Sequence, residues 1–254
     1  MTPQTLSVGS GALARTIAYL HHGGTGPGLV WMQGFMSDMV STKAAALAER
    51  AERDGIALTR FDYSGHGQSG GAFTDGTISR WLEESRAVFE EVTSGPQIVI
   101  GSSMGGYLAM LLERQIADAN RIAGLVLIAP AWDMTEALMW DEFPADVREQ
   151  VMETGVWMRP SAYGDPYPIT RDLIADGRKH LFGDRAWQPA CPVRIIQGRL
   201  DPDVPYDHVA KLLDKAAGAD VTLTEVPDGE HRLSRPEDIA LLLDTIETLR
   251  QDVA

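Results

Sequence analysis

Cysteine is the scarcest informative residue in this sequence. The chain has one, Cys191, so no disulfide can form within it. Cys191 stands next to Pro192 and has neither a CxxC partner nor the spacing of metal ligands, which predicts a small packing residue. A single thiol is also typical of a compartment that keeps cysteines reduced.

Long hydrophobic runs are missing as well. No apolar stretch reaches the length of a transmembrane helix. The N-terminal segment contains Pro3, Gly9 and Gly11, has Arg15 as its one basic side chain, and shows no unbroken apolar core. We therefore expect no signal peptide, no mitochondrial transit peptide and no membrane span, and we predict a cytoplasmic protein.

Acidic residues outnumber basic residues in this chain. The chain has 22 Lys and Arg against 36 Asp and Glu, a formal net charge of −14. This balance disfavours binding to nucleic acids and to anionic membrane surfaces. His21 and His22 have no carboxylate or third histidine beside them, and the glycine run 23–28 lacks the Lys-Ser/Thr ending of a phosphate-binding loop. We expect a solvated loop there rather than a metal or phosphate site.

The sequence does contain a regular alternation of apolar and amphipathic segments. Helical patterns occur at 43–54 and 79–92, and Ser234–Glu237 has the form of a capping box for a terminal helix. Fully apolar strands separated by helices indicate a parallel sheet covered on both faces, hence an α/β protein. We predict one domain over residues 1–254, since 44% hydrophobic residues suffice for one large core. The expected strands lie at 6–8, 13–20, 29–32, 56–61, 97–100, 124–128, 193–197 and 221–226.

The alternation breaks between residues 132 and 188. This segment is rich in aromatic and methionine side chains, including Trp132 and Trp140, and has helical patches but no clear strand. We interpret it as a small lid inserted over the sheet. Its apolar side chains either pack the lid against the body or line an acyl-binding pocket, to which methionine is suited.

A small basic patch lies in the same segment of this acidic chain. It is either a solvated face or a site that holds a substrate anion, with Arg178 as the candidate ligand. The patch comprises Arg171, Arg178, Lys179 and His180.

The most informative stretch runs from Gln97 to Leu112. An apolar β-branched run leads into Gly101-Ser102-Ser103-Met104-Gly105, which fits G-x-S-x-G, and an apolar helix-forming run follows. A sharp strand-to-helix turn here would strain Ser103 and lift its hydroxyl clear of the sheet, with the Met104 N–H facing any oxyanion formed on a substrate. The alternative is an ordinary glycine-rich turn. Ser102 lacks the flanking glycine pattern, and we expect it to serve in turn hydrogen bonding.

A serine nucleophile needs a histidine base, and the histidine needs an orienting carboxylate. His231 follows the expected strand 221–226, so it lies at the same sheet edge as Ser103. The exit loop of strand 193–197 offers two carboxylates, Asp201 and Asp203, of which Asp203 is also a candidate cap for a helix near Pro205. His66 and His208 fit no such position, and His66 is better explained by a compact turn.

Together these segments resemble the α/β-hydrolase fold superfamily over nearly the whole chain. The resemblance is carried by residues 33–35, 62–69, 101–106, 198–205 and His231. It implies a mostly parallel sheet of about eight strands, helices on both faces and a small helical lid.

The resemblance also assigns two further site residues. In such hydrolases a Gly-aspartate-Pro loop supplies the acid, which supports Asp201. The second oxyanion donor is the backbone N–H after a His-Gly pair, which maps to Phe35. This sequence has Gln33 where histidine is usual, a departure that bears on the support of the loop more than on the chemistry, because a backbone donor needs no particular side chain.

Within the superfamily, the elbow, the compact lid and the surroundings of His231 are similar to the mycophenolic acid acyl-glucuronide esterase and palmitoyl-protein thioesterase group. This similarity implies a serine hydrolase that cleaves carboxylic esters or thioesters of small molecules, with an acylated protein as a further candidate substrate. No metal or organic cofactor is needed. The alternatives are a peptidase or carbon–carbon bond hydrolase using the same three residues, and a hydrolase-like binding protein without activity.

Overall fold

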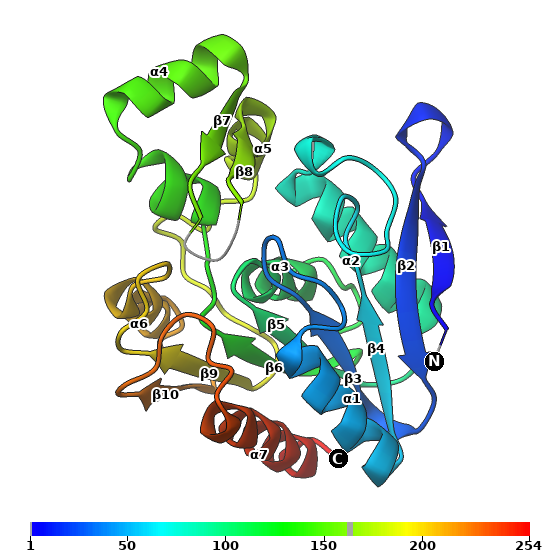
Figure 1. Ribbon diagram of the computed structural model, residues 1–254. Helices are drawn as coiled ribbons and strands as arrows, with labels where there is room; N and C mark the ends of the chain where they lie inside the picture. Colours follow the sequence, from blue (N-terminus) through cyan, green and yellow to red (C-terminus); the bar gives the residue numbers. More distant parts are fainter. Residues whose placement is uncertain (1, 162–164) are drawn as a thin grey trace.

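The computed structural model describes residues 2–161 and 165–254. Its centre is an eight-stranded sheet with the order β1-β2-β4-β3-β5-β6-β9-β10 (Figure 1). The first two pairings, β1 with β2 and β2 with β4, are antiparallel, and the others are parallel. The strands are β1 (Gln4–Val8), β2 (Arg15–His22), β3 (Thr25–Met32), β4 (Ile56–Phe61), β5 (Gln97–Ser102), β6 (Ile122–Ile128), β9 (Val193–Gly198) and β10 (Val221–Val226).

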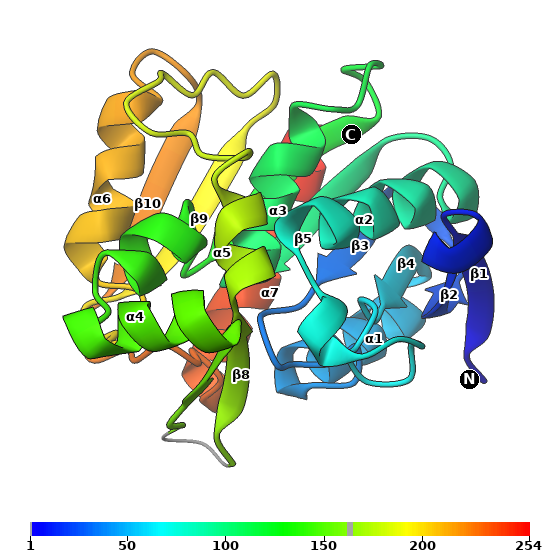
Figure 2. The same ribbon diagram turned by 90° about the horizontal axis from the view of Figure 1, so that it is seen from above.

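Helices cover both faces of this sheet. Viewed from above, α1 and α7 lie on one side of it, and α2, α3 and α6 lie on the other (Figure 2). The fold is therefore the expected α/β architecture with a mostly parallel sheet of eight strands. The helices are α1 (Thr42–Asp54), α2 (Ile78–Val92), α3 (Met104–Glu113), α4 (Ala145–Thr154), α5 (Arg171–Gly177), α6 (Tyr206–Lys215) and α7 (Pro236–Asp252).

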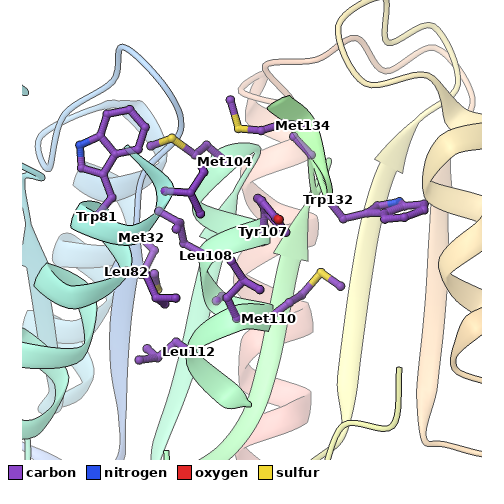
Figure 3. Close-up of a cluster of buried hydrophobic side chains, with 14 of the residues drawn as sticks. Met32, Trp81, Leu82, Met104, Tyr107, Leu108, Met110, Leu112, Trp132 and Met134 are labelled. Carbon is purple, nitrogen blue, oxygen red and sulfur yellow. The ribbon is translucent and has the colours of Figure 1, made fainter. Parts of the chain in front are cut away.

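The apolar run of β5 explains why this strand lies at the centre. Ile98 and Ile100 belong to the buried cluster shared with α1 and α7, whereas Val99 belongs to the cluster shared with α2 and α3. Successive side chains of a strand point to opposite faces, so a strand buried on both faces needs apolar residues at every position. Figure 3 shows part of the larger cluster, which includes Leu82 of α2 and Leu108 and Met110 of α3.

The parallel strands end together at one edge. In the sheet register, Gly101 at the end of β5 pairs with Met32 of β3 and with Leu127 of β6. The loops that follow β3, β5, β6, β9 and β10 therefore meet at that edge, where open α/β sheets bind their ligands.

The N-terminal strands differ from the prediction: β1 and β3 are longer, β2 is shifted by two residues, and β3 includes residues 25–28 of the expected glycine loop. His21 and His22 belong to β2, where they pair with Thr59 and Leu58 of β4, so the expectation of a loop at these histidines was wrong. The connection to β3 is short and turns at Gly23 and Gly24. A Cβ on Gly24 would lie 2.5 Å from the Ala57 amide nitrogen. The turn before β3 therefore passes too close to the backbone of β4 for a residue larger than glycine.

The segment between β6 and β9 forms the predicted insertion, but its structure differs from the prediction. It contains α4, α5 and a π-helical turn at Glu136–Trp140, and also two strands that we did not predict, β7 (Val156–Arg159) and β8 (Tyr167–Thr170). These strands pair with each other in an antiparallel two-stranded sheet. Figure 1 shows α4, α5, β7 and β8 grouped together beyond one end of the main sheet. Part of the predicted lid, residues 162–164, lies outside the described residues.

Two smaller expectations concern α7 and Cys191. The N-cap of α7 is Arg235, whose amide donates to the Asp238 side chain at 3.0 Å; this contact is half of a capping box and lies one residue later than the Ser234 and Glu237 pair that we predicted. The Ser234 hydroxyl instead donates to the Arg232 carbonyl.

Cys191 is a free, buried thiol, as its sequence context predicted. None of the helices in the described part of the chain is long and apolar enough to cross a lipid bilayer.

Candidate active site

Ser103 occupies the turn between β5 and α3. Its backbone has φ 55° and ψ −119°, a conformation that L-residues rarely adopt. The turn is held in place because the Ser103 amide donates to the Ile128 carbonyl at 2.8 Å and the Ser103 carbonyl accepts from Ala131 at 3.1 Å. Backbone strain of this kind costs on the order of 1–3 kcal/mol and is concentrated at functional sites.

The two glycines of the motif make this turn possible. A Cβ on Gly101 would lie 2.3 Å from the Gly105 carbonyl oxygen, and a Cβ on Gly105 would lie 2.1 Å from the Met32 carbonyl oxygen. Both distances are far below van der Waals contact, so neither position accepts a side chain without displacing backbone. The start of α3 is thereby packed directly against the ends of β3 and β5.

His231 lies beside Ser103, although 128 positions separate them in the chain. Its Nε2 is 3.1 Å from the Ser103 Oγ, and its Nδ1 is 2.8 Å from an Asp201 carboxylate oxygen. The Asp201 side chain is fully buried, and that of His231 is 18% exposed. The three residues that the sequence singled out are therefore in continuous hydrogen-bond contact. This is the arrangement in which a histidine can accept the proton of a serine hydroxyl.

The Asp201 carboxylate is held by its own loop. One oxygen accepts hydrogen bonds from the Asp203 amide at 2.9 Å and from the Val204 amide at 2.8 Å. The other oxygen accepts from the Gln197 side chain at 3.2 Å as well as from His231. The loop thus orients Asp201, whereas Asp203 contributes its backbone to this cradle. The N-cap of α6 is Pro205, so the alternative role of Asp203 as a helix cap was wrong.

The loop after His231 is anchored to α1. The Lys43 ammonium donates to the Arg232 carbonyl and, at 3.3 Å, to the Ser234 hydroxyl. Burial lowers the pKa of Lys43 to about 8, with a further contribution from the positive charge of Arg232 and an opposing one from Asp238. The contact ties the His231 loop to the start of α1.

The two backbone amides predicted as oxyanion donors belong to segments that pass next to Ser103. Met104 follows the serine directly and is the first residue of α3. Phe35 follows Gly34, and a Cβ on Gly34 would lie only 3.3 Å from the Ser103 Cβ, so the loop after β3 runs close against the serine. Within the described part of the chain, neither the Phe35 nor the Met104 amide donates a hydrogen bond. Both are therefore available as donors to a ligand.

A cavity of about 720 Å³ opens at Ser103 and His231. Its walls differ in chemistry. On one side the segment after β6 contributes apolar side chains, namely those of Met134, Leu138 and Met139. On another side the start of α1 and the His231 loop contribute polar and basic groups, namely Ser41, Thr42, Lys43, Arg232 and Ser234.

The three predicted substrate-binding side chains have other contacts. Trp132 stacks on the His208 ring with centroids 4.4 Å apart, and its indole N–H donates to the His208 carbonyl at 3.0 Å. Figure 3 shows Trp132 pointing away from α3. Trp140 lies beneath the Arg178 guanidinium, which pairs with Glu136 at 2.7 Å. Among the described residues, those that line the cavity do not include Trp132, Trp140 or Arg178.

The rest of the basic patch is also engaged within the protein. Arg171 donates to the Met152 carbonyl at 3.1 Å, Lys179 pairs with Asp176 at 2.8 Å, and the His180 ring lies 2.7 Å from the Ser79 hydroxyl. The patch therefore joins the parts of the insertion to one another and to α2. These contacts account for its charges without a substrate anion.

Comparisons with known proteins assign the chain to a family. The model of the "Alpha/beta hydrolase family" matches residues 18–240. The chain belongs to this family. Bovine (Bos taurus) palmitoyl-protein thioesterase ABHD10, mitochondrial, is 32% identical over 235 residues, which cover 92% of this chain and 76% of that protein.

Two solved structures are similar over essentially the whole of this α/β hydrolase. The crystal structure of a protein from Agrobacterium vitis S4 superposes with a TM-score of 0.94 at 42% identity, covering 98% of both chains. Mouse alpha/beta hydrolase domain-containing protein 10 superposes with a TM-score of 0.88 at 28% identity, covering 100% of both chains.

One group of side chains in the described part of this α/β hydrolase has the proximity of metal ligands. Asp201, Asp203 and His231 place ligand atoms within 4.8 Å of one another. Because Asp201 and His231 are already hydrogen-bonded to each other, an ion bound between them would have to displace that hydrogen bond. The residues fit an orienting contact better than a metal centre.

Sequence reasoning missed the residues that support the loop after β3, residues 33–39, which carries the predicted donor Phe35 and is called the oxyanion loop below. Asp62 accepts from the Met39 amide at 2.7 Å and from the Gln33 side chain at 3.3 Å. His66 accepts from the Met36 amide at 3.3 Å. We expected only a compact turn at His66, and that turn is present, since the His66 amide donates to the Tyr63 carbonyl. The polar loop 62–71 was the available signal, because it follows a strand next to β3.

Proposed function

We propose that this α/β hydrolase is a serine hydrolase of carboxylic esters and thioesters that works through an acyl-enzyme intermediate. The observation that carries the proposal is the chain of contacts from Ser103 Oγ to His231 Nε2, at 3.1 Å, and from His231 Nδ1 to Asp201, at 2.8 Å. A serine hydroxyl is a weak nucleophile at neutral pH, and this arrangement is the usual means of activating it.

The residues take the following roles in this mechanism. Ser103 Oγ attacks the substrate carbonyl carbon while His231 Nε2 takes the hydroxyl proton. Asp201 keeps the other ring nitrogen protonated and stabilises the imidazolium. The Phe35 and Met104 amides donate to the oxyanion of the tetrahedral intermediate. When that intermediate collapses, His231 returns the proton to the leaving alcohol or thiol, and a water molecule then releases the acyl group by the same steps.

The relatives and the cavity together favour an acyl substrate with an apolar chain. The matched mammalian proteins are named palmitoyl-protein thioesterases, and the cavity wall formed by Met134, Leu138 and Met139 is apolar. We therefore propose small-molecule esters and thioesters as substrates, and long-chain acylated proteins as further candidates. A cytoplasmic location stays a prediction, since the names of these relatives place them in mitochondria.

Ser103→Ala tests the proposal, with Ser102→Ala as the matched control. Both proteins are assayed with a p-nitrophenyl ester and with a fluorophosphonate probe. We expect Ser103→Ala to lose at least about a thousandfold in kcat and all labelling, because the nucleophile is gone. Ser102→Ala should keep both. Ser102 ends β5 and lines the cavity, but among the described residues the hydrogen bonds of the His231 ring go to Ser103 and Asp201.

Two results would contradict the proposal. Labelling retained in Ser103→Ala would place the nucleophile elsewhere. A wild-type protein that neither labels nor hydrolyses esters would favour a binding protein without activity. Amide and ring-cleavage diketone substrates, run beside the esters and thioesters, would separate the peptidase and carbon–carbon hydrolase alternatives.

A further inference from the structure

The oxyanion loop contains a strained turn. The Ser37 amide donates to the Gly34 carbonyl at 3.2 Å and closes a four-residue turn around Phe35 and Met36. Met36, the third residue of this turn, has φ 59°. Turns with a positive φ at that position ordinarily have glycine there, because a side chain is disfavoured in the left-handed region. Because Met36 has a side chain, a contact from outside the turn is needed to hold its backbone in this conformation.

His66 makes that outside contact. Its Nδ1 is 3.2 Å from the Ser64 carbonyl oxygen, which can only accept, so Nδ1 carries the ring proton. In the neutral ring Nε2 is then an acceptor, and it takes a hydrogen bond from the Met36 amide at 3.3 Å. The tautomer follows from the partners: one nitrogen faces an acceptor and the other faces a donor.

The surroundings of His66 keep the ring neutral and fixed. The residue is 4% exposed and lies among the aromatic rings of Phe73, Trp81 and Tyr63, with centroids 5.1, 5.4 and 5.7 Å away. Burial lowers its pKa to about 4, and the hydrogen bond to the Ser64 carbonyl opposes this only in part. At neutral pH, Nε2 therefore remains an acceptor.

The side chain of Phe35 is held by the same cluster. Its ring meets Phe73 and Trp81 edge to face, with centroids 5.0 and 5.8 Å away. Only two backbone angles join the peptide that carries the Phe35 N–H to the peptide that carries the Met36 N–H. A contact that fixes the second peptide, together with a fixed ring, therefore restricts the direction of the first.

We propose that His66 is a positioning residue for the oxyanion hole: by accepting from the Met36 amide, it holds the turn in the orientation that directs the Phe35 N–H toward the carbonyl attacked by Ser103. This inference rests on the proposed function. His66 is not among the cavity-lining residues. It therefore acts on the transition state through the loop and has no direct contact through which to change substrate binding.

His66→Phe and His66→Gln form the test pair. Phenylalanine keeps the aromatic packing and removes the acceptor, whereas a glutamine amide can still accept from Met36 and donate to Ser64. We expect His66→Phe to lose about 10- to 100-fold in kcat on a p-nitrophenyl ester, with KM changed by less than about twofold, because a misdirected donor weakens only the transition state. We expect His66→Gln to recover most of the loss.

A second readout uses a transition-state analogue. An alkyl trifluoromethyl ketone forms a hemiketal oxyanion with the serine, so its Kd should weaken in His66→Phe by the same factor as kcat/KM. His66→Asn, whose amide is too short to reach Met36, replaces the phenylalanine variant if thermal unfolding shows that the latter is not folded. It should then show the loss expected of His66→Phe.

Three outcomes would overturn the inference in a wild-type protein that is active. They are an unchanged kcat in the folded phenylalanine or asparagine variant, an equal loss in His66→Gln, and a rise in KM with kcat preserved. Wild-type labelling by a fluorophosphonate is measured first, because its absence would be a failure of the proposed function and would remove the basis of this inference with it.

Discussion

The His231 ring donates through Nδ1 to Asp201 over 2.8 Å, and this contact joins the loops that follow two neighbouring strands. Since β9 and β10 run parallel and side by side, their exit loops emerge next to each other at the sheet edge. The contact directs the opposite ring nitrogen toward Ser103, which follows the central strand β5. The order of strands in the sheet thus brings three residues that are distant in the sequence into one hydrogen-bonded group.

The Asp201 carboxylate can be tested by removing its charge. Asp201→Asn is expected to lose roughly 10⁴-fold in kcat, the size of the effect known for the equivalent change in chymotrypsin-type proteases, because the amide can turn its N–H toward the ring and favour the wrong tautomer. Steady-state kinetics on a p-nitrophenyl ester measures the loss. Asp203→Asn is the control, since Asp203 reaches the cradle through its backbone amide. Equal losses in both variants would contradict the assignment of the acid.

The tightness of the elbow leads to a second prediction. In Gly105→Ala the new methyl group would lie 2.1 Å from the Met32 carbonyl oxygen, so the start of α3 must shift away from β3. We expect a loss of about 1–3 kcal/mol or more in the free energy of unfolding and a large loss of fluorophosphonate labelling. Gly23→Ala is the control, because a Cβ there has open space around it. Denaturant unfolding and labelling rates of the two variants give the comparison, and an unperturbed Gly105→Ala would disprove the packing argument.

Because His208 is buried, we expect the stability of the protein to depend on pH. Burial lowers the pKa of His208 to about 4 from its ordinary value of 6.5, against the opposing hydrogen bond to the Trp132 carbonyl. Between these two pH values the unfolded chain binds a proton at this position that the folded protein does not. The free energy of unfolding therefore falls as the pH drops from about 6.5 to about 4, by up to about 3 kcal/mol from this group, and the contribution is unaffected above that range.

His208→Gln is the variant that isolates the contribution of His208 to the pH dependence of stability. Glutamine can still donate to the Trp132 carbonyl but does not titrate. Tm is measured for both proteins from pH 7 to pH 4. The wild-type Tm should fall more steeply, and parallel curves would show that His208 does not titrate as its burial requires. His66 has a lowered pKa too, but it is present in both proteins and so cancels.

Local patterns in the sequence were sufficient for the fold class and for the choice of Ser103 and His231, whereas the resemblance to the hydrolase superfamily was needed to choose Asp201 over Asp203. The β-branched run before Ser103, the glycines on both sides of it and the helix-forming run after it each dictate nearby backbone, so the strand, the turn and α3 follow from short-range rules. The continuous apolar runs required a sheet buried on both faces. The fold and the family assignment confirm that interpretation.

Other features depended on partners that lie far away in the chain. The strands β7 and β8 pair with each other across the insertion, so neither needs an apolar pattern of its own. From the sequence, His66 was interpreted only as part of a turn. Its hydrogen-bond partner is the backbone amide of Met36, 30 positions away, and every residue except proline has such an amide, so no residue type in the sequence indicates the contact. Arg178 and Trp140 suggested a substrate contact, and the structure instead places them against each other and against Glu136. The sequence by itself therefore determined the sheet, the elbow and the order of the reactive groups, because backbone propensity and burial act locally. Only the tertiary structure decided how these groups are supported, because a hydrogen bond to a distant backbone atom depends on where the chain passes rather than on which residue it carries.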